Sequence, residues 1–333
     1  MLIQLSSTQA PVVLAAMRDV ASAGGTQALS PADTLALTSF AQFVLRLADA
    51  APIPSWPVVT PADVARALSK AADRDHVLQF LVVMALVDGT VDARKIAVVE
   101  RYAQALDVTE DAVDQLAHLG QGNLAWVRAD VARQNLKSIT GHVVTDSIDA
   151  WIQPYRDGHA DPALSARYRA LGNLPAGTLG RTFCEFYRDN GFVFAGEPQG
   201  LNERFASPHD STHILSGYDT SPQGELLVST FTAGMHPCEP MSGHILPVIL
   251  SWHLGIELAK LPGEITGQLD PPKFWNAWER GSAVRVDVFA DAWDFWKAAA
   301  QPLDALRTAY GVPPLDAQYA AHGDVPVWYK PIA

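Results

Sequence analysis

The sequence predicts an all-α protein made of two helical domains. Apolar residues recur every three or four positions along most of the chain, and no convincing stretch of alternating polar and apolar residues interrupts them. The chain has 333 residues, which is longer than one ordinary hydrophobic core requires. We therefore expect an N-terminal helical bundle over residues 1–160 and a mainly helical second domain over residues 161–333.

The first domain is expected to consist of one amphipathic helix after another. A short apolar stretch at residues 11–17 has no basic region before it, so we expect it to begin a helix rather than to act as a targeting signal. Further helices are expected over residues 35–47, 61–71, 76–87, 92–106, 110–118 and 123–136. Three of the helix starts are signalled by a capping residue, with proline next in two of them: Ser30-Pro31, Thr60-Pro61 and Thr109-Glu110. Residues 50–57 contain three prolines and are expected to form a linker or a rigid loop.

Two helices joined by an acidic turn are expected at residues 80–109. The segment FLVVMALVDGTVD at residues 80–92, with Glu100 and ALDVT at residues 105–109, resembles the tellurite-resistance protein B-like family. That resemblance implies an acidic cluster linked to metal binding. Arg94 and Lys95 replace acidic residues of the family here, so a turn at Asp88 and a helix cap at Asp92 are favoured over a metal site. We expect this domain to be an accessory or interaction module.

The second domain is expected to begin near residue 160. Pro154 and Pro162 bracket a polar run that no apolar periodicity crosses. Further on, residues 244–261 are apolar but mixed, which favours a core helix over channel lining or contact with a membrane surface. Six aromatic residues at helical spacing are also expected in the core, with a cradle for a prenyl chain as the alternative: Phe274, Trp275, Trp278, Trp293, Phe295 and Trp296.

Composition narrows the class of protein. The net charge of -12 argues against nucleic acid as a partner, because phosphates would be repelled. The two cysteines, Cys184 and Cys238, cannot form a disulfide framework or a cysteine-rich zinc module. No segment has the length and purity of a membrane span. We expect a cytoplasmic protein.

The pattern that points most directly to chemistry is HDSTH at residues 209–213, followed by Glu225. His209 and His213 are four positions apart, so on a helix they share one face and can converge on one ion. Asp210 and Glu225 add carboxylates. The motif predicts a divalent metal site formed by His209, Asp210, His213 and Glu225.

Two helices with a short link between them are expected to present this motif. The expected limits are a cap at Ser207 with Pro208 and an end at Gly217 for the first helix, and a cap at Thr220 or Ser221 with Pro222 and an end at Gly234 for the second. The link would bring the start of the second helix close to the end of the first.

A structural role competes with the metal site at each of these residues. Asp210 and Glu225 fall near helix starts, where a carboxylate can simply satisfy free backbone amides. A histidine pair at this spacing is also common in helices that bind no metal. Three further histidines, His236, His244 and His253, are near enough in sequence to support the ligands, but no spacing argument selects any of them.

The surrounding residues resemble the ubiquinone (coenzyme Q) biosynthesis protein 4 family. The resemblance rests on LPAGTLG at residues 174–180, the helical residues 181–188, the HDxxH element at residues 209–213, Gly217, and the segment from Gly224-Glu225 to Gly234. A weaker match follows at residues 302–312, so the resemblance covers about residues 168–314. Residues 205–208 and 235–239 depart from the family pattern.

The resemblance implies a divalent metal, usually zinc, held by the residues matching His209, Asp210, His213 and Glu225. It also implies a channel for a polyprenylated ring or quinone precursor, peripheral membrane contact and association with other quinone-biosynthesis proteins. An oxidative decarboxylation at the ring has been assigned to the family. We further expect a homo-oligomer.

The donor set itself suits zinc and tolerates iron or manganese, because it mixes neutral imidazoles with carboxylates. With one position open, such an ion can polarise a ring oxygen as a carboxyl group leaves, or it can activate water. Two alternatives to ubiquinone biosynthesis therefore stay open. One is a lipid-binding scaffold whose metal is structural, and the other is a metal-dependent hydrolase.

Overall fold

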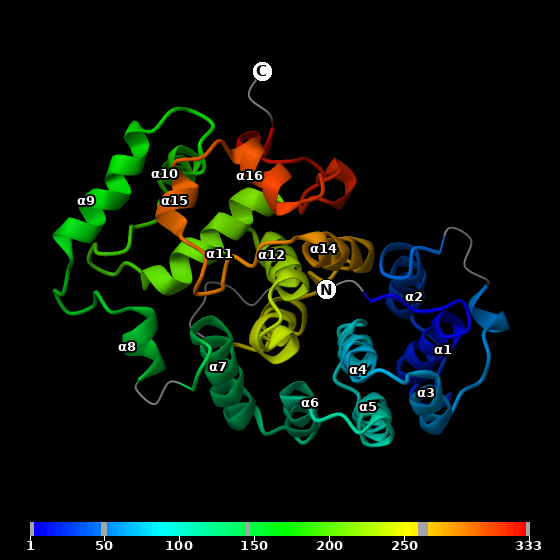
Figure 1. Ribbon diagram of the computed structural model, residues 1–333. Helices are drawn as coiled ribbons and strands as arrows, with labels where there is room; N and C mark the ends of the chain where they lie inside the picture. The colour runs from blue at the N-terminus through cyan, green and yellow to red at the C-terminus, as the bar shows by residue number, and fades with distance from the viewer. Residues whose placement is uncertain (1–2, 48–51, 144–146, 259–265, 331–333) are drawn as a thin grey trace.

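The computed structural model describes residues 3–47, 52–143, 147–258 and 266–330 (Figure 1). Within these residues the fold is all-α, as predicted, and the only β-type pairings are two isolated bridges, Thr178 with Pro302 and Leu254 with Thr266. The α-helices span Ala10–Ala21 (α1), Pro31–Phe43 (α2), Pro61–Ala67 (α3), Ala71–Leu86 (α4), Ala93–Leu106 (α5), Asp111–Gly120 (α6), Leu124–Thr140 (α7), Ile148–Ile152 (α8), Pro162–Ala170 (α9), Leu179–Asn190 (α10), Glu203–Ser216 (α11), Pro222–Met235 (α12), Leu246–Val248 (α13), Pro271–Ala283 (α14), Phe295–Ala299 (α15) and Leu303–Tyr310 (α16).

Short helical turns complete the chain. Single 3-10 turns lie at Ile53–Ser55 (η1), Leu171–Asn173 (η2), Ala317–Tyr319 (η5) and Val327–Tyr329 (η6), and π-helical turns lie at Pro240–Ile245 (η3) and Ile249–His253 (η4). None of the helices in the described ranges combines the length and the apolar character that crossing a bilayer requires.

The helix starts predicted at Ser30-Pro31 and Thr60-Pro61 are confirmed. Ser30 accepts a hydrogen bond from the Asp33 amide at 3.0 Å, and the Asp33 carboxylate accepts one from the Ser30 amide at 2.8 Å. Thr60 and Asp63 form the same reciprocal pair at the start of α3. These capping boxes satisfy backbone amides that a helix start leaves free. At the third predicted start the N-cap is Glu110, whose side chain makes no capping hydrogen bond.

Several predicted helix boundaries are wrong: α2 ends at Phe43 rather than residue 47, α7 ends at Thr140 rather than residue 136, and the corner between α3 and α4 is displaced. Helix α3 ends at Ala67 rather than residue 71, and α4 begins at Ala71 rather than residue 76. The Arg74 guanidinium lies at this corner and donates to the carbonyl of Leu68 at 2.7 Å and to that of Ala65 at 3.2 Å. These bonds satisfy carbonyls at the end of α3, so the chain turns there although the apolar pattern continues.

The acidic turn after α4 forms a buried ion cluster instead of a metal site. The Asp88 carboxylate accepts from the Thr90 amide at 3.1 Å, and Asp92 caps α5 by accepting from the Arg94 amide at 2.8 Å. The Lys95 ammonium is fully buried and contacts Asp88 at 2.8 Å and Asp33 at 3.1 Å. The lysine therefore supplies in this chain the positive charge that the two carboxylates require.

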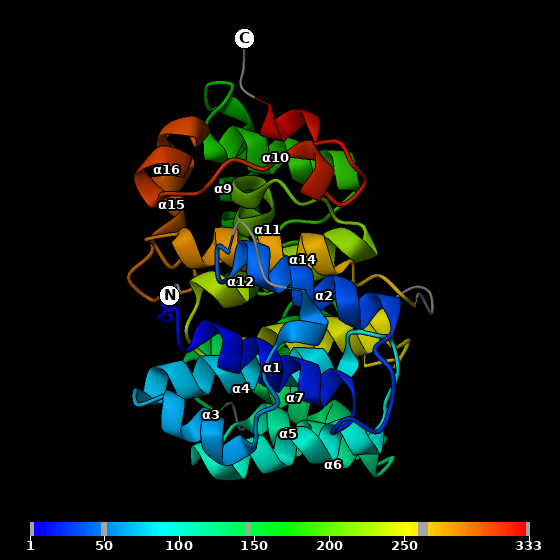
Figure 2. The same cartoon turned by 90° about the vertical axis from the view of Figure 1, so that its right-hand side faces the viewer.

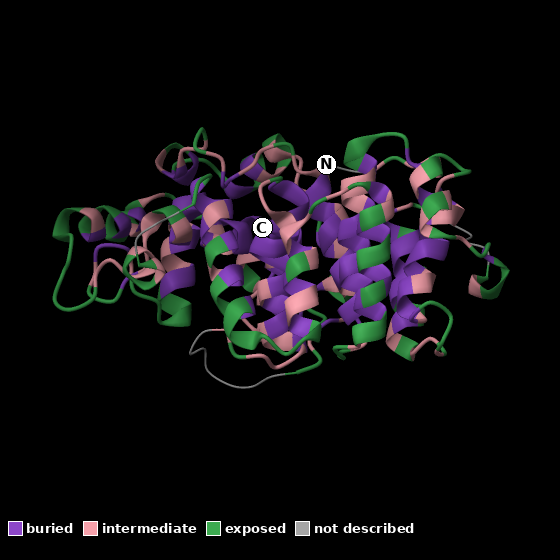
Figure 3. Cartoon of the chain, turned by 90° about the horizontal axis from the view of Figure 1, so that it is seen from below, coloured by how far each residue is buried: buried purple, intermediate pink, exposed green. Residues whose placement is uncertain are grey.

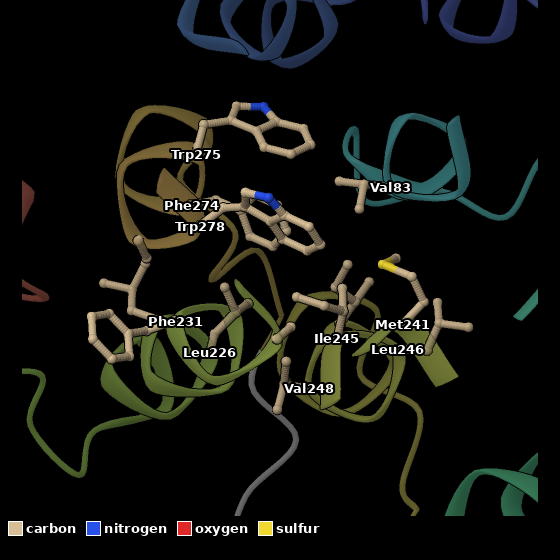
Figure 4. Close-up of a cluster of buried hydrophobic side chains, with 14 of the residues drawn as sticks. Val83, Leu226, Phe231, Met241, Ile245, Leu246, Val248, Phe274, Trp275 and Trp278 are labelled. Atoms are coloured by element: carbon tan, nitrogen blue, oxygen red, sulfur yellow. The ribbon is translucent and has the colours of Figure 1, made fainter. Parts of the chain in front are cut away.

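The core is continuous from the first helices to the last. The Trp275 ring on α14 lies edge-on to Phe40 of α2 at 4.9 Å and to Phe80 of α4 at 5.7 Å between ring centroids. Figure 4 shows Trp275 and Trp278 facing Val83 on one side and the apolar residues of α12 and η3 below. Buried residues gather wherever helices face one another (Figure 3). The prediction that Phe274, Trp275 and Trp278 lie in the core is thus confirmed.

Helices α12 and α14 form the centre of the molecule. They cross where Gly234 meets Trp278 and where Gly281 meets Phe231, so closely that a Cβ on either glycine would collide with the opposite backbone. Gly234 thus serves packing, and α12 ends one residue later than predicted, at Met235.

The two halves of the chain are packed against each other. Helix α14 lies along α2 in the middle of the molecule, and α7 packs on η3 (Figure 2). His236, at the end of α12, donates from Nε2 to the Ser138 carbonyl of α7 at 2.9 Å. The proposed division near residue 160 stays a prediction, and any two domains would share this interface.

The expected helix at residues 244–261 is wrong in its form. The described part consists of the π-helical turns η3 and η4 around the short α13, and it ends at His253. Pro247 lies inside this segment and lacks the amide hydrogen that a regular α-helical ladder would use there, whereas Pro240 stands at the first position of η3, where none is needed. The segment is buried, as a core element would be. Residues 259–261 lie outside the described residues, as do residues 50–51 of the predicted linker.

Candidate metal centre

Helix α11 carries three of the four predicted ligands and begins earlier than expected. Its N-cap is Asn202, whose side chain accepts a hydrogen bond from the Arg204 amide at 3.0 Å, and its first residue is Glu203. Pro208 therefore lies inside the helix and Ser207 does not cap it. The predicted start at these two residues was wrong because the Ser207 hydroxyl forms a 2.5 Å hydrogen bond with the Tyr168 hydroxyl, and burial of this turn outweighs the one helical bond that proline removes.

The link between α11 and α12 has the predicted form. Gly217 follows α11 with φ of +89°, the left-handed conformation that ends a helix without strain at glycine. Of the two predicted caps, Ser221 is the one used, because its hydroxyl accepts the Gly224 amide at 3.1 Å while the Thr220 hydroxyl donates to another helix. Glu225 is consequently in the first turn of α12, close to α11.

The side chains of His209, His213 and Glu225 meet at one point. The two Nε2 atoms are 3.3 Å apart, and each lies 3.4 Å from an oxygen of Glu225: Oε2 for His209 and Oε1 for His213. A zinc ion with tetrahedral bonds of ~2.0–2.1 Å separates its ligand atoms by ~3.3 Å. The two imidazole nitrogens therefore have the separation of two corners of a zinc tetrahedron, and the Glu225 carboxylate lies beside both, with a different oxygen near each ring.

The orientation of the His213 ring leaves the correct atom for a metal. Its Nδ1 lies 3.0 Å from the carbonyl oxygen of Tyr218, which can only accept a hydrogen bond. Nδ1 must carry a proton, so Nε2 can offer its lone pair once its own proton is released. A backbone carbonyl thus selects the tautomer that a metal ligand requires.

Asp210 lies close to the same two histidines. One ligand atom from each of His209, Asp210 and His213 can be chosen so that all lie within 4.8 Å of one another. The Oδ2 atom of Asp210 accepts a 2.5 Å hydrogen bond from the Tyr187 hydroxyl of α10. The capping role that the sequence left open for Asp210 is excluded, since the residue lies in the middle of α11.

The charges at the site are strongly coupled. Burial alone would lower the pKa of His213, but the carboxylates of Glu225 and Asp210 outweigh it and raise the pKa to about 9. Burial alone would raise the pKa of Glu225, but the charge of His213 and hydrogen bonds from both histidines lower it. Burial raises the pKa of Asp210. The metal-free protein therefore holds a proton on His213, and a cation must displace that proton to bind.

The site is closed on one side and open on the other. His213 is 1% exposed and Asp210 is 8% exposed, whereas the side chains of His209 and Glu225 are each 21% exposed. The ring of Phe205 stacks on that of His209 at 5.1 Å and forms one edge of the opening. A bound ion would keep access to solvent or to a ligand on the side of His209 and Glu225.

His236, His244 and His253 make contacts of their own within the described structure. His236 bonds Asp287 at 2.8 Å, and His253 contacts the Val87 carbonyl at 3.1 Å. His244 packs against His236 and is buried, and burial lowers its pKa to about 3. Within the described residues, no hydrogen bond joins any of the three to the four predicted ligands, although the charge of His209 also acts to lower the pKa of His244.

An aromatic pocket of about 370 Å³ lies on the opposite face of α11. Residues 204, 207 and 208 line it, and on a helix they lie about half a turn around from residues 209 and 213. The rings on its walls include three of the six aromatic residues considered for a prenyl cradle: Trp293, Phe295 and Trp296. This pocket is therefore separate from the candidate metal centre.

The sequence did not reveal two groups that complete the site. Tyr187 looks like an ordinary buried aromatic residue of an amphipathic helix, and its hydroxyl becomes important only through the packing of α10 on α11. Tyr218 acts through its backbone carbonyl, so its side chain gives no signal.

Comparison with known proteins found neither a matching family model nor a matching curated protein. The family resemblances of both halves therefore stay predictions.

Proposed function

We propose that the protein binds one divalent cation, with zinc the best fit, through His209, His213 and Glu225, and that Asp210 completes or orients this set. The observation that carries the proposal is the convergence of three side chains: the two imidazole Nε2 atoms are 3.3 Å apart, and each lies 3.4 Å from one of the two oxygens of Glu225. It is also supported by the fixed Nδ1 proton of His213 and by the position of the donors on two adjacent helices, α11 and α12. Iron or manganese would also suit two imidazoles with carboxylates.

The substrate class that we propose is a polyprenylated aromatic ring or quinone of ubiquinone biosynthesis. Its support is the resemblance at residues 174–234 together with the partly exposed side of the site at His209 and Glu225. A bound divalent cation would supply a Lewis acid for a ring carboxylate or phenolate oxygen. His209 and Glu225 would border that oxygen, while Asp210 and His213 would stay shielded from water. Decarboxylation of the ring is the reaction that this arrangement would assist.

Cobalt substitution tests the metal and its open position together. Cobalt(II) added to the purified full-length chain should give the visible spectrum of a four-coordinate ion, and 4-hydroxybenzoate should then shift that spectrum. The His213→Ala variant should give the spectrum of free cobalt, and His159→Ala, which removes an exposed imidazole, should behave like the wild type. A wild-type chain that leaves cobalt in its aqueous form would refute the metal site.

A structural metal in a lipid-binding scaffold is the second candidate, because the deep burial of His213 and Asp210 suits an ion that fixes two helices. Mass spectrometry of lipid extracts separates the two functions. A scaffold should keep its co-purified prenyl lipid when Glu225→Ala removes the metal. A ring ligand bound to the metal should be lost from the same variant, while Glu257→Ala, outside the site, should retain it.

A further inference from the structure

The C-terminal end of α11 is held by two arginines from distant parts of the chain. Arg280 of α14 donates to the Ser216 carbonyl at 2.8 Å. Arg307 of α16 donates to the carbonyls of Ile214 at 2.8 Å and Leu215 at 3.3 Å. These are the carbonyls that the last turn of a helix leaves without partners, and positive charge is favourable there.

Arg280 is the more deeply buried of the two. It is 3% exposed, and its guanidinium lies 5.2 Å above the ring of Tyr218. Within the described residues its hydrogen bonds go to the carbonyls of Ser216 and Pro313 and to the Tyr329 hydroxyl, rather than to a carboxylate. Burying a charge without a counterion destabilises a fold. The charge of Arg280 is stabilised instead by the carbonyl oxygen at the C-terminal end of α11.

The turn that Arg280 holds is the turn that orients His213. Ser216 binds the guanidinium, and Tyr218, two residues later, accepts the Nδ1 proton of His213 and packs its ring beneath the same guanidinium. Gly217 between them is left-handed, and the Tyr329 ring packs against it so closely that no Cβ would fit. The position of the Tyr218 carbonyl therefore depends on how firmly this turn is held.

We propose that Arg280 is a positioning residue of the metal centre: its guanidinium fixes the turn at residues 216–218, so that the Tyr218 carbonyl holds the His213 ring with Nε2 toward the ion. The inference rests on the proposed metal site. Arg307 contributes to the same helix end, but it also pairs with the exposed Asp304 at 3.1 Å and is farther along α11 from the Tyr218 carbonyl.

The test compares Arg280→Met with a matched control, Arg285→Met. Arg285 also caps a helix end, donating to the Thr308 and Ala309 carbonyls of α16 at 3.2 Å, but it contacts neither α11 nor the link to α12 in these hydrogen bonds. Zinc affinity is measured on the full chain, and the imidazole nitrogens of His213 are followed by ¹⁵N NMR. Arg280→Met should weaken zinc binding by roughly 10- to 100-fold, the usual effect of losing a group that orients a ligand.

The NMR signals of His213 should shift in Arg280→Met, whereas Arg285→Met should leave both the affinity and the signals unchanged. If Arg280→Met does not fold, Arg280→Lys decides, because lysine keeps the charge but cannot bridge Ser216 and Pro313 with a planar fork. Reduced zinc affinity in a folded Arg280→Lys supports the inference. Wild-type affinity together with wild-type His213 signals in a folded Arg280 variant overturns it. A wild-type chain without zinc affinity overturns the proposed function as well.

Discussion

At the scale of single residues, the candidate site depends on two groups that are not metal ligands but bind the predicted ligands. The Tyr187 hydroxyl binds Asp210, and the Tyr218 carbonyl binds His213. Each partner fixes the direction of one donor before an ion arrives, which reduces the entropy lost on binding.

Removal of the Tyr187 hydroxyl should weaken the site without disrupting the fold. In Tyr187→Phe the Asp210 carboxylate loses its 2.5 Å hydrogen bond in a buried setting, and we expect zinc affinity to fall by roughly tenfold or more. Calorimetric zinc titration measures it. Tyr168→Phe is the control, since it removes an equally short hydrogen bond, to Ser207, within the same aromatic cluster. Equal zinc affinities for the two variants would argue against a role for Tyr187.

Glu110 should make stability depend on pH. Burial raises its pKa from 4.5 to about 7, although a hydrogen bond from Gln79 acts in the opposite direction. Below pH 4.5 the folded and unfolded states both hold the proton. Between pH 4.5 and about 7 the unfolded state releases it first, so the free energy of unfolding should fall as pH rises, by about 3 kcal/mol at most.

Denaturant unfolding of Glu110→Gln at several pH values tests this dependence. The variant should gain stability relative to the wild type as pH rises through that window, and Glu100→Gln, on an exposed position, should not. If the free energies of unfolding of the wild type and Glu110→Gln differed by the same amount at every pH, the expectation for Glu110 would be contradicted.

The residue types and spacing of the ligands were predictable, because i and i+4 positions share a helix face and Glu225 follows a clear helix start. The partners were not, since a hydroxyl supplied by α10 and a carbonyl in a turn depend on tertiary packing alone.

At the scale of helices, a buried lysine joins α2, the turn after α4 and α5. Lys95→Met would leave the carboxylates of Asp33 and Asp88 without their cation, and we expect a loss of about 3–5 kcal/mol in the free energy of unfolding. Arg94→Met, which removes a neighbouring exposed ion pair with Asp92, should cost about 1 kcal/mol or less. Urea denaturation gives both values, and similar losses for the two variants would contradict the importance of the buried cluster.

Helix boundaries were predictable where a cap and a proline act locally, as at Ser30 and Thr60. They were not predictable where burial overrides local preference. Pro208 marked a helix start in the sequence but lies inside α11, and the apolar segment at residues 244–253 forms π-helical turns around the short α13. At Ser207 the deciding contact is the hydrogen bond with Tyr168 of α9.

At the scale of the whole molecule, the aromatic core joins the helices before residue 160 to those after it. Phe40 and Phe80 meet Trp275 and Trp278, and α14 packs on α2. We therefore expect one cooperative unfolding transition, because opening either half would expose this shared surface. Calorimetry on the metal-free chain measures it, and Trp275→Ala should lower the single midpoint. Two well-separated transitions would show instead that the halves unfold as independent domains.

The central claim is that α11 and α12 close on one divalent cation. Elemental analysis after equilibrium dialysis against zinc tests it most directly, with the double variant His209→Ala/His213→Ala and, as a control, His159→Ala/His322→Ala, which removes two exposed imidazoles. We predict one zinc per chain in the wild type and the control, and none above background in the His209/His213 variant. A wild-type chain without zinc, or equal zinc in all three proteins, would contradict the account.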